Sequence, residues 1–155
     1  MKIKLITFGK MDKNYFREAG NDYQNRLKNY AQIEILELTE STSSDSNKNT
    51  KNHENMIKNS LEKLKYGYEV FLLDNLGTNY DSENLSAIFA NNKNFKSGKI
   101  ALIIGPSEGF TIEFKNNFSK ISLGKNTFPH QLLRIMLLEQ IYRSFKIINN
   151  EKYHK

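Results

Sequence analysis

The side chains best suited to proton transfer lie near the C-terminal end of the chain. His130 is followed four residues later by Arg134, so a helix would place both side chains on one face. The chain closes with Tyr153, His154 and Lys155, which offer a ring, an imidazole and a cation. Because imidazole titrates near physiological pH, these groups are candidates for contact with a nucleotide. A packing or capping histidine and a loosely held tail are the simpler interpretations of the same residues.

Three glycine-containing segments form a second candidate site. LLDNLG (residues 72–77), IIGPSEGF (103–110) and SLGKNTFPH (122–130) each continue from an apolar stretch. Ligands of α/β sheets bind beyond the C-terminal ends of the strands, and glycine allows close backbone approach there. Together the segments predict a pocket of backbone donors and acceptors, although each glycine taken singly could simply turn the chain. None matches G-x-G-x-x-G or the Walker pattern, which excludes a Rossmann or P-loop site.

Length and composition narrow the class of protein. The 155 residues suffice for one core, so we predict a single domain over residues 1–155. The chain has no cysteine, and Asp74 and Asp81 form no ligand spacing with a histidine, so we expect no metal. The longest apolar run, residues 100–104, is far shorter than the roughly 18 residues of a membrane span. The start of the chain lacks the pattern of a signal peptide, and we expect a cytoplasmic protein.

The net charge of +6 is concentrated at the two ends of the chain. Residues 1–30 carry seven basic and three acidic side chains, and residues 125–155 carry six and two. Residues 31–124 carry ten basic and twelve acidic side chains. Basic ends are compatible with a nucleic-acid partner, because lysine and arginine neutralise phosphates. A solvated lysine-rich surface would give the same pattern.

Alternating strand and helix patterns supply the elements that position these groups. The strands are apolar on both faces, which predicts an α/β fold with a parallel sheet covered by helices on both sides. Residues 39–52 read as a polar mobile loop, with His53 exposed beside it. The expected strands are 2–8, 33–38, 70–73, 100–104 and 121–123, and the expected helices are 12–30, 56–64, 81–89, 111–118 and 129–149.

The last of these helices is apolar around most of its circumference. Leu133, Met136, Leu138 and Tyr142 cannot all face one side of a helix. Such a helix is buried from several directions, against its own sheet and against a partner subunit, which favours a homodimer over a simple core helix.

The combination of IIGPSEGF, LGKNTFPHQLLRIMLLEQIYRSFKI and a terminal YHK resembles a known family. The chain is similar, over essentially its whole length, to the small ribosomal RNA large-subunit methyltransferases of the SPOUT class. Members of that family methylate N3 of a pseudouridine in helix 69 of bacterial 23S rRNA. The TFPH turn, the EQIYR run and the YHK end are the most telling motifs.

The resemblance implies a fold, a cofactor, a partner and a set of site residues. The implied fold is a SPOUT α/β sheet with a C-terminal trefoil knot, which no sequence pattern reveals. The implied cofactor is S-adenosyl-L-methionine, and the implied assembly is a homodimer with its site near the interface. The cofactor residues carried over are Leu73, Gly105, Leu123, Gly124, Lys125, Asn126, Thr127 and Phe128, and the nucleotide-side (catalytic) residues are His130, Arg134, Tyr153, His154 and Lys155.

One departure from the family pattern lies in the second loop. Pro106 follows Gly105 where the family usually has a second glycine, so the amide at this position cannot be a donor to the cofactor. His130 or His154 is the expected proton acceptor for N3. Two alternatives stay open: a SPOUT enzyme acting on tRNA, and a non-catalytic ribosome-binding factor that has lost cofactor affinity.

Overall fold

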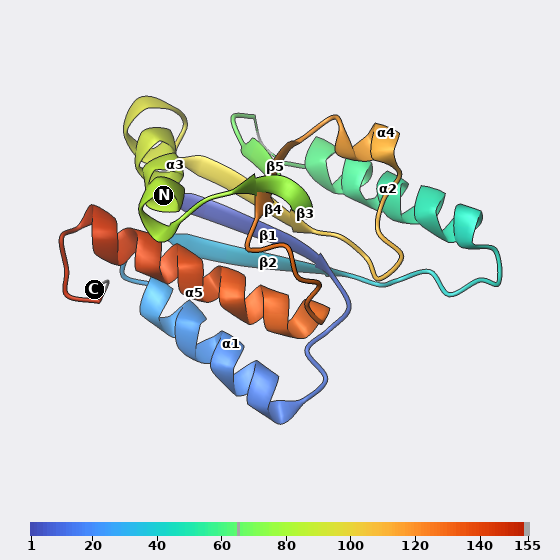
Figure 1. The fold of residues 1–155 in the computed structure, drawn as a ribbon, viewed down its shortest axis with the longest axis horizontal. Helices are drawn as coiled ribbons and strands as arrows, with labels where there is room; N and C mark the ends of the chain where they lie inside the picture. Colours follow the sequence, from blue (N-terminus) through green and yellow to red (C-terminus); the bar gives the residue numbers. More distant parts are fainter. Residues whose placement is uncertain (65, 154–155) are drawn as a thin grey trace.

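The computed structural model describes residues 1–64 and 66–153 of the chain. Five parallel strands form one sheet in the order β2-β1-β4-β3-β5 (Figure 1). The α/β class and the parallel sheet predicted from the sequence are confirmed. The strands are β1 (Lys2–Phe8), β2 (Gln32–Leu38), β3 (Glu69–Asn79), β4 (Lys99–Ile104) and β5 (Ser119–Ser122). The helices are α1 (Asn14–Leu27), α2 (Ser46–Glu62), α3 (Ser82–Phe95), α4 (Ile112–Lys115) and α5 (His130–Ile148).

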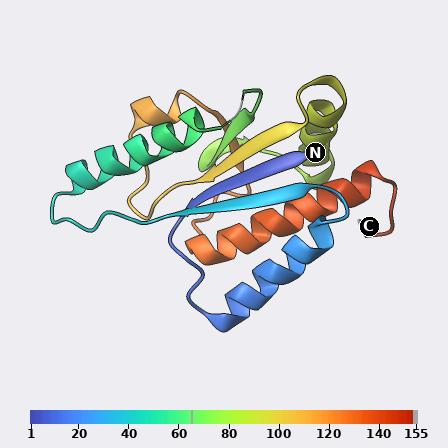
Figure 2. The same cartoon turned by 180° about the vertical axis from the view of Figure 1, so that it is seen from behind.

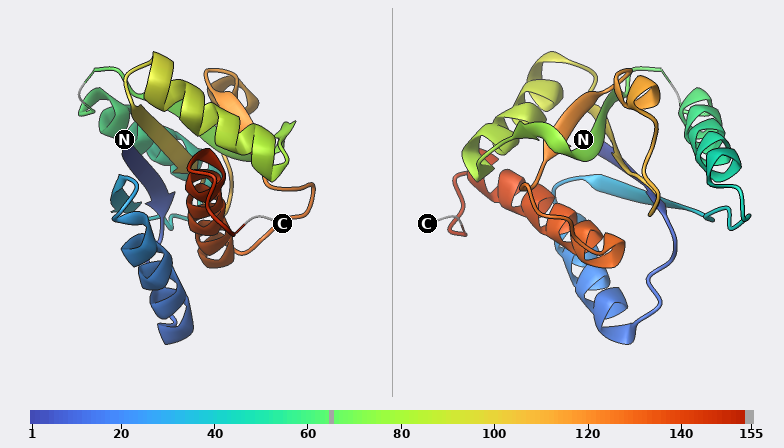
Figure 3. Two further views of the ribbon diagram at one scale, coloured as in Figure 1. Left: turned by 90° about the vertical axis from the view of Figure 1, so that its left-hand side faces the viewer. Right: turned by 45° about the vertical axis from the view of Figure 1, so that its right-hand side comes forward.

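Helices cover both faces of the sheet. On one face α5 lies between α1 and α3, and on the other α2 lies beside the short α4 (Figures 1, 2 and 3). Strand β1 contributes side chains to the cores on both faces of the sheet. Its Ile3 and Leu5 pack in the α1, α3 and α5 layer, whereas Ile6 and Phe8 pack against α2 and α4. A central strand buried on both faces therefore reads as a nearly continuous apolar run.

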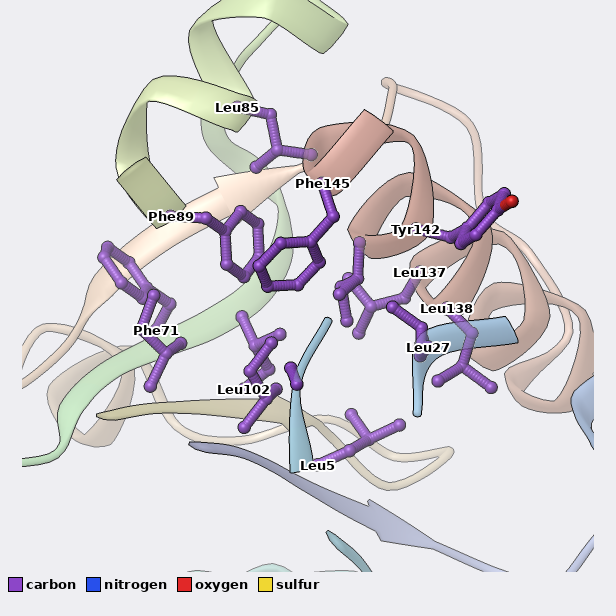
Figure 4. Close-up of a cluster of buried hydrophobic side chains, with 14 of the residues drawn as sticks. Leu5, Leu27, Phe71, Leu85, Phe89, Leu102, Leu137, Leu138, Tyr142 and Phe145 are labelled. Carbon is purple, nitrogen blue, oxygen red and sulfur yellow. The ribbon is translucent and has the colours of Figure 1, made fainter. Parts of the chain in front are cut away.

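The larger core lies beneath α5. Phe145 of this helix packs against Phe89 of α3, with ring centroids 6.2 Å apart, as Figure 4 shows. Tyr30 packs against both Tyr142 and Phe145 of α5, with ring centroids 5.9 and 5.8 Å apart. Helix α5 thus buries one face against α1, α3 and the core, whereas Leu133, Ile135 and Met136 stay half-buried in the single chain.

The prediction of a loop holds for residues 39–45, which form no helix or strand, but it is wrong for residues 46–52, and His53 is buried rather than exposed. Helix α2 begins at Ser46, where the side chain of Asp45 accepts a hydrogen bond from the Lys48 amide and caps the helix. Asn49 and His53 face inward and are only 2% and 1% exposed. The buried face of this half of α2 is therefore polar, and a search for apolar periodicity cannot detect it.

The first helix also starts differently from the prediction. Asp12 does not cap α1, whose N-cap residue is Lys13 without a side-chain cap. The Asp12 carboxylate instead accepts a hydrogen bond of 2.7 Å from the Gln131 side chain, and the Asp12 amide donates to the Gln131 oxygen over 3.1 Å. This reciprocal contact joins the β1–α1 connection to the first turn of α5, so the two basic ends of the sequence meet there.

Strand β3 is interrupted where it pairs with β5. Residues 71–73 pair with 119–121, and after a register shift residues 78–79 pair with 121–122. The four residues between, 74–77, bulge out of the ladder. At the end of this bulge Gly77 approaches the β5 backbone so closely that a Cβ would lie 2.8 Å from the carbonyl carbon of Lys120. We expect only glycine to allow this packing.

Replacing Gly77 with alanine is accordingly expected to push β5 away from β3. We expect the Gly77→Ala variant to lose about 1–3 kcal/mol of unfolding free energy, the usual cost of overpacking. Urea denaturation followed by circular dichroism measures the loss. Thr78→Ala, at an exposed neighbouring position, is the matched control. Equal stability of the two variants would show that β5 shifts without cost.

Candidate functional site

A cavity of about 290 Å³ opens beside the bulge of β3 and the C-terminal ends of β4 and β5. Its volume lies near the lower end of the range for small-molecule sites, about 300–1,000 Å³. The three loops predicted from the sequence all contribute to its walls. Seven of the eight predicted cofactor residues line it: Leu73, Gly105, Leu123, Gly124, Asn126, Thr127 and Phe128. Lys125 is exposed and does not belong to the lining.

The bulge of β3 forms the first wall. Asp74, at its start, accepts a hydrogen bond of 2.9 Å from the Leu76 amide, which shapes the turn. The same carboxylate forms a 2.9 Å ion pair with Lys115 of α4, and its side chain is 5% exposed. Burial raises the pKa of Asp74, but the hydrogen bonds from Lys115 and Leu76 outweigh burial and leave the pKa below its ordinary value. The carboxylate therefore stays charged at the edge of the cavity.

The ion pair predicts a pH-dependent stability. A carboxyl whose pKa is lower in the folded than in the unfolded protein stabilises the fold above the unfolded value, about 3.9 for aspartate. That contribution is lost as the pH falls through the lower folded pKa. We expect Lys115→Met to raise the pKa of Asp74 and to destabilise the protein at pH 7, with a smaller difference from wild type at pH 3. Urea titrations at both pH values test this, with exposed Lys93→Met as control. A difference independent of pH would contradict the pairing.

The β4–α4 loop (residues 105–111) forms the second wall. The Pro106 carbonyl accepts a hydrogen bond of 2.9 Å from the Gly109 amide, which closes a turn over residues 106–109. Gly109 takes a φ of 73°, in the left-handed region that favours glycine. Gly105 lies directly against the ring of Phe110, since a Cβ built on it would be 3.0 Å from the Phe110 Cε2 atom. This turn uses the carbonyl of Pro106 and requires no N–H donor at that position, so proline fits there.

The segment after β5 forms the third wall. The buried Ser122 hydroxyl donates to the Gly124 carbonyl over 2.8 Å and accepts from the Gly124 amide over 3.1 Å. Gly124 has a φ of 134°, which side-chain-bearing residues rarely adopt. These contacts turn the chain sharply from β5 toward residues 126–128, whose atoms line the cavity.

His130 is the predicted nucleotide-side residue that reaches the cavity. It is the first residue of α5 and lines the cavity next to Leu133. Within the described part of the chain, its buried Nδ1 atom has no hydrogen-bond partner. Because the residue borders the cavity, its imidazole is placed to accept a proton from a bound molecule.

Arg134 lies elsewhere. Its guanidinium is buried and forms a 2.6 Å ion pair with Glu37 of β2, and it does not line the cavity. His130 and Arg134 lie four residues apart in α5, as predicted, but the Arg134 guanidinium binds Glu37 and does not reach the cavity that His130 lines. In the folded chain Arg134 joins α5 to the sheet.

Tyr153 lies toward the other end of α5. Its hydroxyl donates to Glu139 over 3.1 Å, and its ring lies edge-on to Tyr142 at 5.0 Å. Arg143 lies 4.9 Å from the Tyr153 ring. Burial, together with Tyr23 and Glu139, raises the pKa of Tyr153 above its ordinary value, so the phenol is neutral. Glu139 follows His130 by nine residues. The part of α5 that Tyr153 contacts therefore lies roughly 14 Å from His130 along the helix axis.

The remaining predicted residues, His154 and Lys155, lie outside the described residues. Among the residues that are described, no group of three or more His, Asp or Glu side chains could hold a metal ion. Over the same part of the chain, no helix has the length and apolarity needed to cross a membrane.

The cavity also contains residues that sequence reasoning did not select. Asp74 and Phe110 belong to segments predicted to form the pocket but were given no role of their own there, and Lys115 was not singled out. Asp74 could have been found from its place in the LLDNLG loop, directly after a fully apolar strand. The sequence carries no signal for Lys115, because its role depends on the tertiary contact between α4 and β3.

Comparison with known proteins identifies the family to which this site belongs. A family model described as "Predicted SPOUT methyltransferase" matches residues 1–154. The chain belongs to the SPOUT methyltransferase family. A protein of Mycoplasma capricolum subsp. capricolum named "Ribosomal RNA large subunit methyltransferase H" is 49% identical over 156 residues, covering 100% of both chains. A protein of the same name from Mesoplasma florum is 43% identical, also over 100% of both chains.

These matches confirm the resemblance to the ribosomal RNA large subunit methyltransferase H group of the SPOUT family. A solved structure described as "Structural insights into the 2-OH methylation of C/U34 on tRNA" has a TM-score of 0.53 to this chain. It covers 97% of this chain and 98% of its own at 14% identity, so it shows a shared fold and no more. The SPOUT family assignment therefore rests on the sequence matches, and the fold agrees with it.

Proposed function

We propose that this chain is an S-adenosyl-L-methionine-dependent methyltransferase that methylates N3 of a pseudouridine in helix 69 of 23S rRNA, in the assembled ribosome. The observation that carries the proposal is the position of His130 beside a cavity walled by three glycine-containing loops. Full-length relatives named for large-subunit rRNA methylation support the choice of RNA. We further propose that residues 1–155 act as one SPOUT domain in the cytoplasm, where ribosomes work, and that its C-terminal part forms the trefoil knot of the family.

The lining of the cavity fits S-adenosyl-L-methionine. Leu73, Leu123 and Phe128 offer apolar surface to an adenine ring, and the backbone of the glycine-containing loops offers polar groups that can approach closely. The proposed holding residues are Leu73, Gly105 and the stretch 123–128. When bound, the cofactor supplies a methyl group already activated by its sulfonium.

The chain's own residues then have two tasks. The loops exclude water and hold the methyl group in line with the attacking nitrogen, which supplies much of the rate enhancement. N3 of the target base must lose its proton, and we assign this step to the His130 imidazole, with His154 as the second candidate acceptor. Lys155 is proposed to contact phosphate or the N3 anion.

The charge distribution supports an RNA substrate. The hydrogen bonds between Asp12 and Gln131 bring the exposed Lys10 and Lys13 beside the first turn of α5, where His130 lies. Lys125 is exposed in the third wall of the same cavity. Cations gathered around the mouth of the site would neutralise phosphates next to a splayed-out base.

A homodimer would complete the proposed site. Within one chain, Tyr153 bonds to Glu139, which lies roughly 14 Å along α5 from His130, and Tyr153 does not line the cavity. Two chains packed with their α5 helices antiparallel would place the tail of one beside the cavity of the other. The half-buried Ile135 and Met136 line a second hollow on α5 that suits such a contact.

The decisive experiment is methyl transfer in vitro. Purified protein and labelled S-adenosyl-L-methionine are incubated with ribosomes from a strain that lacks the enzyme, and the modified position is mapped by mass spectrometry. We expect one methyl group on a pseudouridine of helix 69. Methylation of tRNA in a parallel reaction would instead identify a tRNA enzyme. A protein that shows no heat of binding with S-adenosyl-L-methionine in calorimetry would be a non-catalytic ribosome-binding factor.

A further inference from the structure

The β4–α4 loop, the second wall of the cavity, is held from outside by two carboxylates. Oε1 of Glu40 accepts hydrogen bonds from the amide and hydroxyl of Ser107, over 3.2 and 3.1 Å. Oε1 of Glu54 accepts from the amide and hydroxyl of Thr111, over 2.9 and 2.7 Å. Ser107 and Thr111 lie close to either end of this loop, so the two carboxylates fix it at two points.

Both carboxylates belong to residues 39–54, hereafter the clamp segment. It comprises the connection after β2 and the first half of α2, which lies beside α4 in Figures 1 and 2. The clamp segment contributes nothing to the cavity lining. Its effect on the cavity must therefore pass through the loop that it holds.

The clamp segment is itself braced by two buried polar side chains. The His53 Nε2 atom accepts a hydrogen bond of 2.8 Å from the Ser41 amide, next to Glu40. The Asn49 side chain accepts from the Ser43 amide over 3.0 Å and donates to the Ser43 carbonyl over 2.9 Å. Because both side chains are almost completely buried, these bonds are shielded from competing water. A segment with few apolar residues thus has a defined conformation.

We propose that Glu40 and Glu54 are positioning residues for the methyl-donor site, acting through the β4–α4 loop; this rests on the proposed function. Hydrogen bonds to a charged acceptor are stronger than those between neutral groups, so each carboxylate restrains its end of the loop in the shape that lines the cavity. The Ser107 and Thr111 amides point outward to the clamp segment and are not available to a ligand. The Thr111 hydroxyl also caps α4, since it accepts from the Phe114 amide over 3.2 Å. Glu54 thereby connects α2 to the helix that carries Lys115.

The test separates affinity for the methyl donor from turnover. Glu40→Ala and Glu54→Ala are each expected to raise the Kd and KM for S-adenosyl-L-methionine about tenfold, from the loss of hydrogen bonds to a charged group. The kcat at saturating donor should stay near that of the wild type, because neither side chain touches the cavity. Glu40→Gln and Glu54→Gln keep an acceptor oxygen without its charge, and smaller increases are expected. Glu62→Ala, at an exposed position of α2, is the matched control.

Amide hydrogen exchange supplies a readout that does not depend on activity. Glu40→Ala should speed exchange of the Ser107 amide and leave the Thr111 amide unchanged. Glu54→Ala should speed exchange of the Thr111 amide and leave the Ser107 amide unchanged. If an alanine variant does not fold, the Kd of the glutamine variant at the same position for S-adenosyl-L-methionine tests the proposal in its place. Donor affinity equal to that of Glu62→Ala would overturn the proposal, even if exchange is faster, because the loop would then loosen without consequence. Wild-type protein that binds no S-adenosyl-L-methionine would instead contradict the proposed function.

Discussion

Deleting His154 and Lys155 is expected to lower methyl transfer to ribosomes by at least about 100-fold, the scale of a lost general acid–base group. Donor affinity and the thermal midpoint should change little, because the truncation ends after Tyr153. That residue must be kept, since its hydroxyl bonds to Glu139 and its ring packs on Tyr142. Removing Tyr153 would also remove these contacts with α5, and a loss of activity could then result from lower stability rather than from lost catalysis.

Single-turnover methylation and calorimetry with S-adenosyl-L-methionine measure the two effects separately. Lys152→Ala, which removes an exposed cation just before Tyr153, is the matched control and should retain activity. His154→Ala alone should lower turnover more than ribosome binding. Lys155→Ala should mainly weaken binding and reduce its salt dependence. Normal methylation by the truncated protein would leave His130 as the remaining candidate base.

Mixing two inactive variants tests whether the site is shared between subunits. His130→Ala retains an intact tail, and the truncated chain retains an intact His130. Random reassociation of equal amounts makes half the dimers mixed, and each mixed dimer holds one complete site. About a quarter of the wild-type activity should return if the subunits are related by two-fold symmetry. A mixture as inactive as its components would place both groups within one chain.

Gly105→Val is expected to weaken S-adenosyl-L-methionine binding by about 10- to 100-fold, corresponding to an overpacking cost of about 1–3 kcal/mol. A Cβ at this position already meets the Phe110 ring at 3.0 Å, and valine adds two methyl groups. Phe110 packs on Phe8 and Phe114, with ring centroids 6.2 and 4.8 Å away. The ring cannot retreat without disturbing this cluster, so thermal stability should fall together with affinity.

A rescue experiment distinguishes a steric cause from general unfolding. Leucine at position 110 leaves room for a methyl group, so Gly105→Ala combined with Phe110→Leu should bind the cofactor better than Gly105→Ala alone. Phe110→Leu by itself is the control. Wild-type affinity in Gly105→Val would show that this loop does not border the cofactor.

Much of the scaffold could be predicted from local patterns. Residues 100–104 are apolar at every position and became β4, buried on both faces. Residues 130–148 carry too many apolar side chains for one face and became α5, packed between α1 and α3. Gly105 and Gly124, which follow β4 and β5, indicated where the cavity would form, whereas Gly77 lies within β3 and does not line the cavity. In each case the signal is hydrophobic burial or backbone geometry, which the local sequence records directly.

Features that depend on polar tertiary contacts could not be predicted. The inward face of α2 is formed by Asn49 and His53, whose partners lie in residues 41–43 and give no periodic pattern. Arg134 has the helical spacing to share a face with His130, yet Glu37, 97 positions away, determines where its guanidinium lies. Tyr153 was predicted to face the nucleotide, with a loose tail as the simpler interpretation, whereas in the structure it packs on Glu139 and Tyr142. Such partners are specified only by the complete fold.

The strand order has a consequence for synthesis of the chain. Strand β1 lies between β2 and β4, so one edge of β1 stays unpaired until residues 99–104 have been made. Elongation from the end of β2 to the end of β4 takes roughly 3–13 s at typical rates of about 5–20 residues per second. During that interval the nascent chain presents an apolar strand edge that a chaperone can bind or another chain can pair with. Helix α5 then emerges last and closes the larger core, so the protein reaches its folded state only after nearly its whole length has been translated.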